Sequence, residues 1–431
     1  MGTISEHTLP LANYTDRLDV MNFLNEVVGL YPQAISFASG RPLEDFFDFS
    51  KWNDYVNHFA CHHAKNLDVS VEKSIKLIGQ YGKTQGIIND LIAQHLDKDE
   101  DIQVDPENII VTDGAQEAMT LSLLTMFNKD KDVLLIGNPT YIGMTGIASI
   151  LDIETMSVEY DDFGPRIDAI QARVEQARQV GKKVKGFYVI ADFDNPSGKC
   201  VSLERRMELL ECCAEKQITI FEDNPYGLFY FEEKLPTIKS LDKWDIVTYF
   251  GTFSKTICPA LRVGFVVTKQ KVKKDNGDQY SITEGYEKIK SFVTLNTGQF
   301  NQAVVGGVLL ECGGSLKRYL SAMVETYKHN RDVMLSSLEA ELGDLKKQGV
   351  LSWNTPSGGF FITLSLPFSF KESQLVECAE QFGVIGVPTA FFSDNDQHDK
   401  QLRLSYSYVK PQEIKHGVSQ LAKFIHKYSA T

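Results

Sequence analysis

The sequence predicts an α/β fold, with a large domain built on a mostly parallel seven-stranded sheet flanked by helices and a smaller α+β domain. Three observations lead to this prediction. The chain has 431 residues, which is more than one simple hydrophobic core organises. Its middle alternates apolar strand-like runs with amphipathic helical segments, as βαβ crossovers do. Its last hundred residues change to short strands mixed with two helices, which indicates a second domain.

The elements of the large domain follow one another from about residue 108. Seven short apolar runs are expected to form its strands: NIIVT (108–112), VLLIG (133–137), ETMSV (154–158), KGFYVI (185–190), ITIFED (218–223), IVTYF (246–250) and VGFVV (263–267). Helical periodicity separates them over 115–127, 167–179 and 203–216. The polar stretch 269–281 is expected to be a surface excursion, and the pattern turns helical from about 283 to 347.

Domain boundaries are expected near residues 75 and 330. Residues 76–330 would form the large domain. Residues 331–431 would form the small C-terminal α+β domain, with strands at GFFITLSL (359–366) and QLRLSYS (401–407). The segment 1–75 lacks the βαβ rhythm, so we expect it to join the small domain.

Composition and charge exclude several classes of function. The net charge of −13 and the pI near 5.3 disfavour nucleic acid and anionic membranes as partners, because both require a basic face. No long apolar run and no secretory signal is visible, so we expect a cytoplasmic protein. The seven scattered cysteines suit free thiols in a reducing compartment. His58, Cys61, His62 and His63 share one helical stretch without a second ligand cluster, so we predict a solvated helix face and no metal.

A lysine between small hydroxyl residues marks the candidate reacting centre. It is Lys255 in GTFSKTICPALRVG (251–264), directly after a predicted strand. Thr252 and Ser254 can donate to phosphate oxygens, and Arg262 can pair the same phosphate through its forked guanidinium. Beside such cations and partly desolvated, Lys255 would have a lowered pKa and become a nucleophile toward an aldehyde. An exposed loop lysine is the alternative, but it does not account for the whole set.

Polar residues at other strand ends suggest the same kind of site. VTDGAQEAM (111–119) places a helix start after a strand, where backbone N–H groups suit a phosphate or form an ordinary cap. In FEDNPYG (221–227), Asp223 is either a cap or the buried partner of a cationic ring nitrogen, and Tyr226 can donate to a phenolate oxygen. Asn195 in DNPSG (194–198) belongs to the site or to a simple turn.

Together these motifs resemble fold-type I pyridoxal-5′-phosphate (PLP) enzymes of the class I and II aminotransferases, and within them the kynurenine and α-aminoadipate aminotransferase branch. The resemblance runs from about residue 35 to 409, and S/T-x-S-K followed by proline and R-x-G is its most specific part. It implies the PLP-dependent transferase fold type I and the cofactor PLP. It also implies transfer of an amino group between an L-amino acid and a 2-oxo acid.

The resemblance further implies roles for the matching residues. Lys255 would form the Schiff base with PLP and carry the proton at the substrate Cα. Asp223 would hold the ring N–H, Tyr226 and Asn195 would bind the 3′-oxygen, and Tyr141 would stack on the ring. The phosphate would be held by Gly114, Ala115, Gln116, Thr252, Ser254 and Arg262. Tyr81, in GQYGKTQG, would reach the phosphate of a neighbouring subunit, which implies a homodimer with active sites at the subunit interface.

Substrate contacts are implied at the two ends of the chain. Arg403, in LRLSYS, would clamp the α-carboxylate, with Asn195 and Gly40 close by. The chain departs from its relatives at Asn138 and Asp194, and it places Arg41 on the substrate side. We expect Arg41 to contact the substrate side chain, although an ordinary surface arginine is the alternative.

Two other functions are compatible with these motifs. The same cofactor serves cyclases, β/γ-elimination and replacement enzymes and oxidases, which share the carbanion step with transaminases and diverge afterwards. A non-catalytic regulator could keep the fold, but such regulators usually carry an N-terminal DNA-binding module. Only about thirty-five residues precede the resemblance here, which is fewer than an ordinary domain contains.

Overall fold

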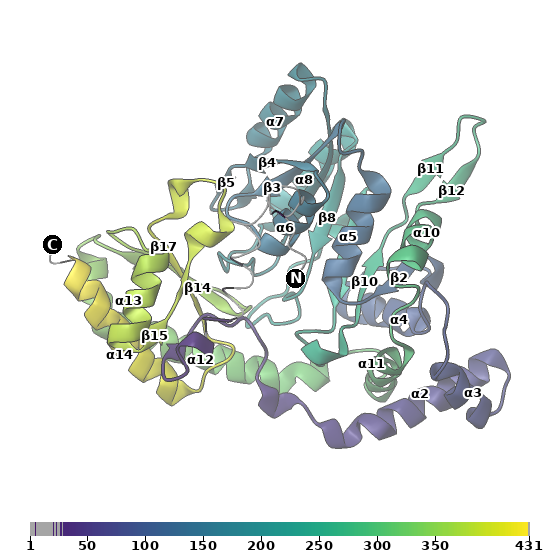
Figure 1. Ribbon diagram of the computed structural model, residues 1–431, viewed down its shortest axis with the longest axis horizontal. Helices are drawn as coiled ribbons and strands as arrows, with labels where there is room; N and C mark the ends of the chain where they lie inside the picture. Colours follow the sequence, from purple (N-terminus) through teal and green to yellow (C-terminus); the bar gives the residue numbers. More distant parts are fainter. Residues whose placement is uncertain (1–4, 6–19, 21–22, 24–25, 28, 430–431) are drawn as a thin grey trace.

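The structure is a computed structural model that describes residues 5, 20, 23, 26–27 and 29–429, and its larger sheet has seven strands (Figure 1). The strand order is β2-β10-β9-β8-β7-β3-β4. Only the pairings of β10 are antiparallel, so the predicted mostly parallel sheet is confirmed. The strands are β2 (Ile109–Thr112), β3 (Asp132–Gly137), β4 (Glu154–Val158), β7 (Lys183–Val189), β8 (Thr219–Asp223), β9 (Val247–Thr252) and β10 (Gly264–Val267).

Helices cover both faces of this sheet. α5 (Ala115–Met126), α6 (Ile142–Ile150) and α10 (Thr283–Val293) lie on one face, and α7 (Ile167–Gln179) and α8 (Leu203–Lys216) on the other. Successive residues of β3 alternate between the two cores: Val133 and Leu135 face α7 and α8, whereas Leu134 and Ile136 face α5 and α6. Because both faces are buried, the strands are continuous apolar runs, which is why the sequence revealed them.

A second sheet of four antiparallel strands lies beside the first (Figure 1). Its order is β13 (Ser352–Trp353), β14 (Phe361–Ser365), β17 (Gln401–Ser405) and β16 (Val387–Pro388). It is accompanied by α13 (Glu372–Phe382) and α14 (Pro411–Ser429), and α14 packs against the long α12 (Lys317–Lys347). We propose that the two sheets with their helices are separate domains with boundaries near 75 and 330, the latter inside α12.

The N-terminal segment contacts both halves of the molecule. β1 (Ile35–Ser36) pairs in parallel with β15 (Val384–Ile385) of the C-terminal part. Further on, α2 (Trp52–Leu67) packs against α11 (Gln299–Glu311), and α3 (Val71–Ile78) follows. Gly307 permits this packing, because a Cβ there would lie 2.1 Å from the carbonyl oxygen of Tyr55. Most of residues 1–28 of the predicted segment lie outside the described residues.

The polar stretch 269–281 forms a hairpin that projects from the body (Figure 1). Its strands are β11 (Lys271–Lys273) and β12 (Gln279–Ser281), joined by a turn in which Gly277 has φ of +92°. A smaller hairpin joins β5 (Tyr160–Asp161) to β6 (Gly164–Pro165), and α9 (Ile238–Leu241) is a single turn. Among the described helices, none is long and apolar enough to cross a membrane.

The histidine-rich stretch belongs to α2. His62 contacts Asp90 at 3.0 Å, and His63 contacts Ser74 at 3.0 Å while stacking on Phe59. Within the described part of the chain, no group of three or more His, Cys, Asp or Glu side chains is placed to hold a metal.

Candidate active site

A cavity of about 1210 Å³ lies beyond the carboxyl ends of the parallel strands. Ligands of open α/β sheets bind at this edge, since the loops that follow the strands converge there. Residues after β2, β3, β7, β8 and β9 line one side, and residues from β14, β17 and the N-terminal segment line the other. The predicted residues in the lining are Gly40, Arg41, Ala115, Gln116, Tyr141, Asn195, Asp223, Tyr226, Thr252, Ser254, Lys255, Arg262 and Arg403.

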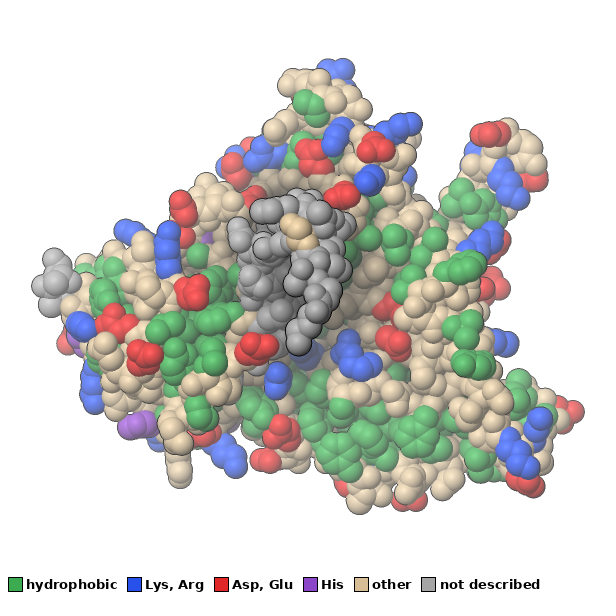
Figure 2. Space-filling model, in the orientation of Figure 1, with side chains coloured by type: hydrophobic (Ala, Val, Ile, Leu, Met, Phe, Trp, Pro, Cys, Tyr) green, Lys and Arg blue, Asp and Glu red, His purple; other side chains and the backbone are tan. Residues whose placement is uncertain are grey.

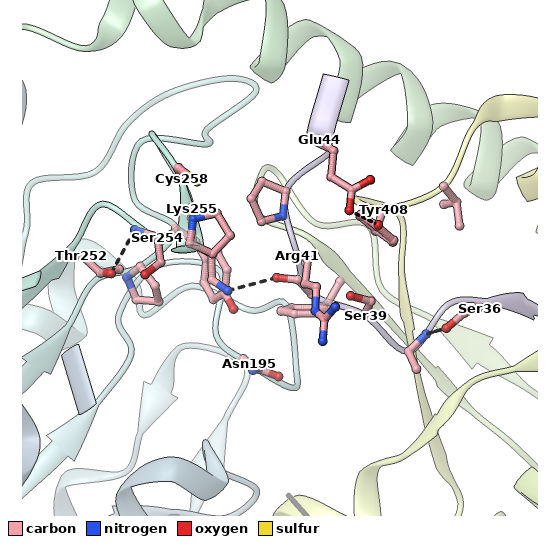
Figure 3. A pocket seen from close by; sticks show the side chains of 18 of the residues that line it. Ser36, Ser39, Arg41, Glu44, Asn195, Thr252, Ser254, Lys255, Cys258 and Tyr408 are labelled. Carbon is pink, nitrogen blue, oxygen red and sulfur yellow. Dashed lines mark hydrogen bonds between the residues drawn. The ribbon is translucent and has the colours of Figure 1, made fainter. Parts of the chain in front are cut away.

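Lys255 follows β9 and extends its amine into this cavity (Figure 3). Its Nζ donates to the carbonyl oxygen of Gly40 at 3.2 Å. Burial lowers the pKa of Lys255 to about 8, and the positive charges of Arg262 and Arg41 act in the same direction against the attraction of Asp223. About a tenth of the amine is therefore neutral at pH 7, far more than for an ordinary lysine, and the neutral form is the nucleophilic one.

Asp223 is the last residue of β8 and is buried. Its Oδ2 accepts a hydrogen bond from the hydroxyl of Tyr188 at 2.7 Å. Its Oδ1 is buried with no hydrogen-bond partner among the described residues. Burial raises the pKa of Asp223 to about 7, although the Tyr188 bond opposes this shift. A buried carboxylate oxygen without a donor is costly, so this atom is suited to a protonated nitrogen of a ligand.

The residues predicted to bind phosphate meet where β2 and β9 end and β10 begins. Arg262 directs Nη1 to Ser254 Oγ at 3.4 Å and Nη2 to the carbonyl oxygen of Asp113 at 3.3 Å. Gly114, with φ of +76°, precedes α5, and a Cβ on it would lie 2.2 Å from Arg262 Nη2. The side chain of Thr252 accepts from the N–H of Ser254 at 3.1 Å. The start of α5, which has no side-chain cap, therefore lies next to the guanidinium, and this combination suits a phosphate.

Two tyrosines line the same cavity as Lys255 and Asp223. Tyr141 is the N-cap residue of α6, its ring lies next to Gly143 and its hydroxyl interacts with Gln116, and burial raises its pKa to about 12. Tyr226 is buried against Phe360 and Phe361, with ring centroids 5.1 and 5.7 Å away. Burial raises the pKa of Tyr226 well above its usual value, so its hydroxyl stays protonated and can donate.

Arg403 lies on β17 at the far side of the cavity. Its Nη1 donates to Asn195 Oδ1 at 2.6 Å, and its Nη2 donates to the carbonyl oxygen of Ala38 at 2.6 Å. Its guanidinium lies 4.5 Å from the ring centroid of Phe361. Burial lowers the pKa of Arg403 to about 10, and its Nε has no hydrogen-bond partner among the described residues. Such a desolvated guanidinium is prepared for an anion.

Gly40 lies in the N-terminal segment between Lys255 and the second sheet. A Cβ at this position would lie 2.6 Å from the ring of Phe361, so any larger residue would require that ring to shift. The neighbouring Arg41 is exposed and also lines the cavity. Tyr81, in contrast, lies outside this lining and is 81% exposed. The structure thus brings the predicted residues together around one cavity, with Tyr81 apart from them.

Some residues of the site were not predicted. Tyr188, within the apolar run of β7, holds Asp223, and a tyrosine inside a buried strand is the signal that could have found it, because its hydroxyl needs a partner. Tyr408 and Glu44 form a 2.6 Å hydrogen bond at the cavity, although 364 residues separate them. Proximity across such a separation leaves no pattern in a single sequence.

The two departures from related sequences are accommodated locally. Asp194 accepts from the side chain of Ser197 at 2.7 Å, so it organises the turn that carries Asn195, and burial raises its pKa to about 6. Asn138 accepts a 2.7 Å hydrogen bond from Ser393, which connects the loop after β3 to the C-terminal part.

Comparisons with known proteins are consistent with this geometry. A family model described as aminotransferase class I and II matches residues 53–421. The chain is 40% identical over 407 residues to (S)-3,5-dihydroxyphenylglycine transaminase of Amycolatopsis orientalis, covering 94% of this chain and 91% of that protein. It is 32% identical over 395 residues to aromatic-amino-acid aminotransferase 1 of Thermococcus litoralis, covering 91% and 88%. The crystal structure of Pyrococcus horikoshii kynurenine aminotransferase, with PMP, KYN and KYA, has a TM-score of 0.80 at 27% identity, covering 94% of each chain.

Proposed function

The chain belongs to the class I and II aminotransferase family, and from this premise we propose that the cavity beyond the large sheet is its active site, with Lys255 as the reacting amine. The predicted resemblance to this family and its kynurenine aminotransferase branch is confirmed. The protein is a PLP-dependent enzyme that transfers an amino group between an L-amino acid and a 2-oxo acid. Nothing in these matches favours a cyclase, an elimination or replacement enzyme, or an oxidase.

The residues of the cavity fit PLP in number and in chemistry. The unpaired Oδ1 of Asp223 fits the ring N–H, and Tyr226 has a hydroxyl for the ring oxygen. Ser254, Arg262 and the start of α5 fit the phosphate. The observation that carries the proposal is that a lysine amine and a buried, unpaired carboxylate oxygen face the same cavity.

When bound, PLP supplies an electron sink for the bonds at the substrate Cα. Each residue then has a separate task. Asp223 keeps a proton on the ring nitrogen, because a carboxylate beside that N–H favours its charged form. Nζ of Lys255 takes the proton from Cα and returns it, and its lowered pKa matches a general base near neutral pH. Arg403 and Asn195 hold the α-carboxylate and thereby orient Cα toward Lys255.

We propose an aromatic amino acid or arylglycine as one substrate. Two relatives support this proposal by their names: one is a transaminase of (S)-3,5-dihydroxyphenylglycine, and the other is an aromatic-amino-acid aminotransferase. Phe47, Phe49, Phe361 and Tyr408 line the cavity and offer apolar faces for an aromatic side chain. A screen of amino donors with the cofactor-loaded protein would rank aromatic donors first.

We propose a homodimer in which Tyr81 completes the site of the neighbouring subunit, and a cytoplasmic location. Phe292 is 94% exposed, Tyr81 81% and Phe300 51%, and such exposed aromatics are typical of an interface. Gln299, next to Phe300, donates to the carbonyl oxygen of Leu77 at 3.1 Å, which connects the segment of Tyr81 to α11. Figure 2 shows hydrophobic side chains gathered over the region of α2 and α11.

The seven cysteines support the proposed cytoplasmic location, because all of them are free thiols, as is usual in a reducing compartment.

The proposal is tested by removing the amine. In Lys255→Ala, the rate of amino transfer should fall at least about a thousandfold, because the group that moves the Cα proton is lost. Transfer is followed with a coupled assay for the 2-oxo acid, and PLP incorporation is followed by absorbance. Lys243→Ala, at an exposed lysine outside the cavity, should keep wild-type activity. A Lys255→Ala protein with wild-type turnover would contradict the assignment.

A further inference from the structure

A buried ion pair lies next to the turn that leads into α5. Lys290 of α10 donates from Nζ to Glu117 of α5, at 3.1 Å from Oε1 and 2.9 Å from Oε2, where the two helices pack together (Figure 1). The side chain of Lys290 is 0% exposed and that of Glu117 is 7% exposed. Because both charges must be taken out of water, such a pair adds little net stability, and a gain in stability does not explain its presence.

The amine of Lys290 is fully engaged by hydrogen bonds. Besides Glu117, it donates to Thr294 Oγ1 at 2.9 Å and to Thr297 Oγ1 at 3.1 Å. The hydroxyl of Thr294 donates to Glu117 Oε1, and the hydroxyl of Thr297 donates to the carbonyl oxygen of Val111 in β2 at 3.1 Å. Because its polar groups are paired, this network holds α5, β2 and the connection between α10 and α11 in one arrangement.

Glu117 extends the network to Asp113, the residue before Gly114. Its Oε2 accepts from the backbone N–H of Asp113 at 2.6 Å. The carboxyl of Asp113 accepts from the backbone N–H of Gly298, the N-cap residue of α11. The carbonyl oxygen of Asp113 accepts from Arg262 Nη2 at 3.3 Å. Glu117 therefore fixes the turn from which Arg262 is aimed.

Helix capping by itself accounts for Glu117 but not for Lys290. A glutamate at the third position of a helix commonly binds a backbone N–H that precedes the helix, as Glu117 does. This carboxylate lies in the first turn of α5, at the positive end of the helix, where the proposed function also places the phosphate. Two anions so close together repel each other. The ammonium of Lys290 cancels the charge of Glu117, so the turn keeps its hydrogen-bond acceptor without that repulsion.

We propose that Glu117 and Lys290 are positioning residues for the cofactor phosphate. Glu117 fixes the Asp113–Gly114 turn, and Lys290 cancels the charge that Glu117 brings to the start of α5. The inference rests on the proposed function, which places the phosphate there. Neither side chain lines the cavity, so both act through the turn and through Arg262.

The test compares two ligands that differ only in the phosphate. Cofactor-free protein is titrated with PLP and with pyridoxal, and the bound aldehyde is followed by absorbance. In Lys290→Met, the dissociation constant for PLP should rise about 30-fold, because an uncompensated carboxylate then opposes the phosphate. The constant for pyridoxal should change less than about threefold, since pyridoxal carries no phosphate. Lys288→Met, at an exposed lysine of the same helix, is the matched control and should bind both ligands as the wild type does.

Two double variants separate the charge from the hydrogen bond and keep the test valid if Lys290→Met does not fold. Glu117→Gln/Lys290→Met removes both charges and keeps an acceptor for Asp113, so its dissociation constant for PLP should lie within about threefold of the wild type. Glu117→Leu/Lys290→Met also removes the acceptor, and its constant for PLP should rise about tenfold with pyridoxal binding unchanged. A merely structural pair would instead raise the constants for PLP and pyridoxal equally.

Equal changes for the two ligands, or PLP binding unchanged in both Lys290→Met and Glu117→Leu/Lys290→Met, would overturn the role of the pair. A wild-type protein that binds PLP no more tightly than pyridoxal would overturn the proposed phosphate site instead. Calorimetry with inorganic phosphate would still decide the role of the pair in that case. Phosphate binding that is weaker in Lys290→Met and restored in Glu117→Gln/Lys290→Met supports the role, and identical binding in all the variants rejects it.

Discussion

The burial of Asp223 has a measurable consequence for the stability of the cofactor-free chain. Its pKa is raised from 3.8 to about 7, so the folded state holds a proton that the unfolded state has released between those values. The free energy of unfolding should therefore fall as the pH rises from about 4 to 7, by up to about 1.4 kcal/mol per pH unit from this group. In Asp223→Asn this contribution disappears, and the variant should be the more stable protein at pH 7.

The measurement is urea unfolding of cofactor-free protein at several pH values in this window. Asp275→Asn, at an exposed carboxyl in the β11–β12 hairpin, should retain the wild-type slope. Parallel slopes for the wild type and Asp223→Asn would show that Asp223 is ionised throughout, contrary to the expectation.

The candidate site residues at strand ends could be singled out in the sequence, because each of them follows an apolar run at a recognisable distance. Asp223 ends such a run, and Lys255 stands three residues beyond another. The interactions that tune these residues could not be predicted. Tyr188 lies 35 residues from Asp223, and Gly40 lies 215 residues from Lys255. Such contacts depend on how strands and segments are ordered in space, which local periodicity does not encode.

At the scale of elements, the junction of β2 with α5 depends on a glycine. Gly114 has φ of +76°, and a Cβ would collide with Arg262. Gly349 has a similar φ of +72° but open space around it. In both glycine-to-alanine variants the backbone strain should cost about 1–2 kcal/mol of unfolding free energy.

Only Gly114→Ala should also displace Arg262. The dissociation constant of Gly114→Ala for PLP should rise at least about tenfold, equivalent to about 1.4 kcal/mol of binding free energy. Gly349→Ala should bind PLP as the wild type does. Fluorescence titration of the cofactor-free proteins measures both. Equal dissociation constants for PLP in the two variants would show that Arg262 does not contribute to phosphate binding.

The elements themselves were largely visible in the sequence. The seven predicted strand segments correspond to β2, β3, β4, β7, β8, β9 and β10. The antiparallel direction of β10 was not predicted, because strand direction depends on the connection and not on composition. The surface excursion at 269–281 is a hairpin, and its Asn-Gly turn at 276–277 was the available signal.

At the scale of the whole molecule, the proposed dimer predicts complementation between two inactive variants. Lys255→Ala and Tyr81→Ala proteins are mixed, unfolded and refolded together with PLP. In a hybrid dimer, the Lys255 of one chain meets the Tyr81 of the other, so one of the two sites is intact. Roughly a quarter of the wild-type activity should return, because half of the dimers are hybrids with one working site.

Each variant refolded alone is the control and should stay inactive or weak. A mixture no more active than the mean of its components would place Tyr81 in the site of its own chain, or outside any site. Light scattering of the same samples reports whether a dimer exists at all.

The way residues 37–41 are anchored has a consequence for how the substrate specificity of such an enzyme can change. Their backbone is held by hydrogen bonds of its own N–H and carbonyl groups, so the side chain at position 41 can be exchanged while the contacts of this segment with Lys255 and Arg403 are kept. A library randomised at codon 41 should therefore yield mostly folded proteins that bind PLP, as their absorbance would show, and that differ in the amino acids they use as substrates.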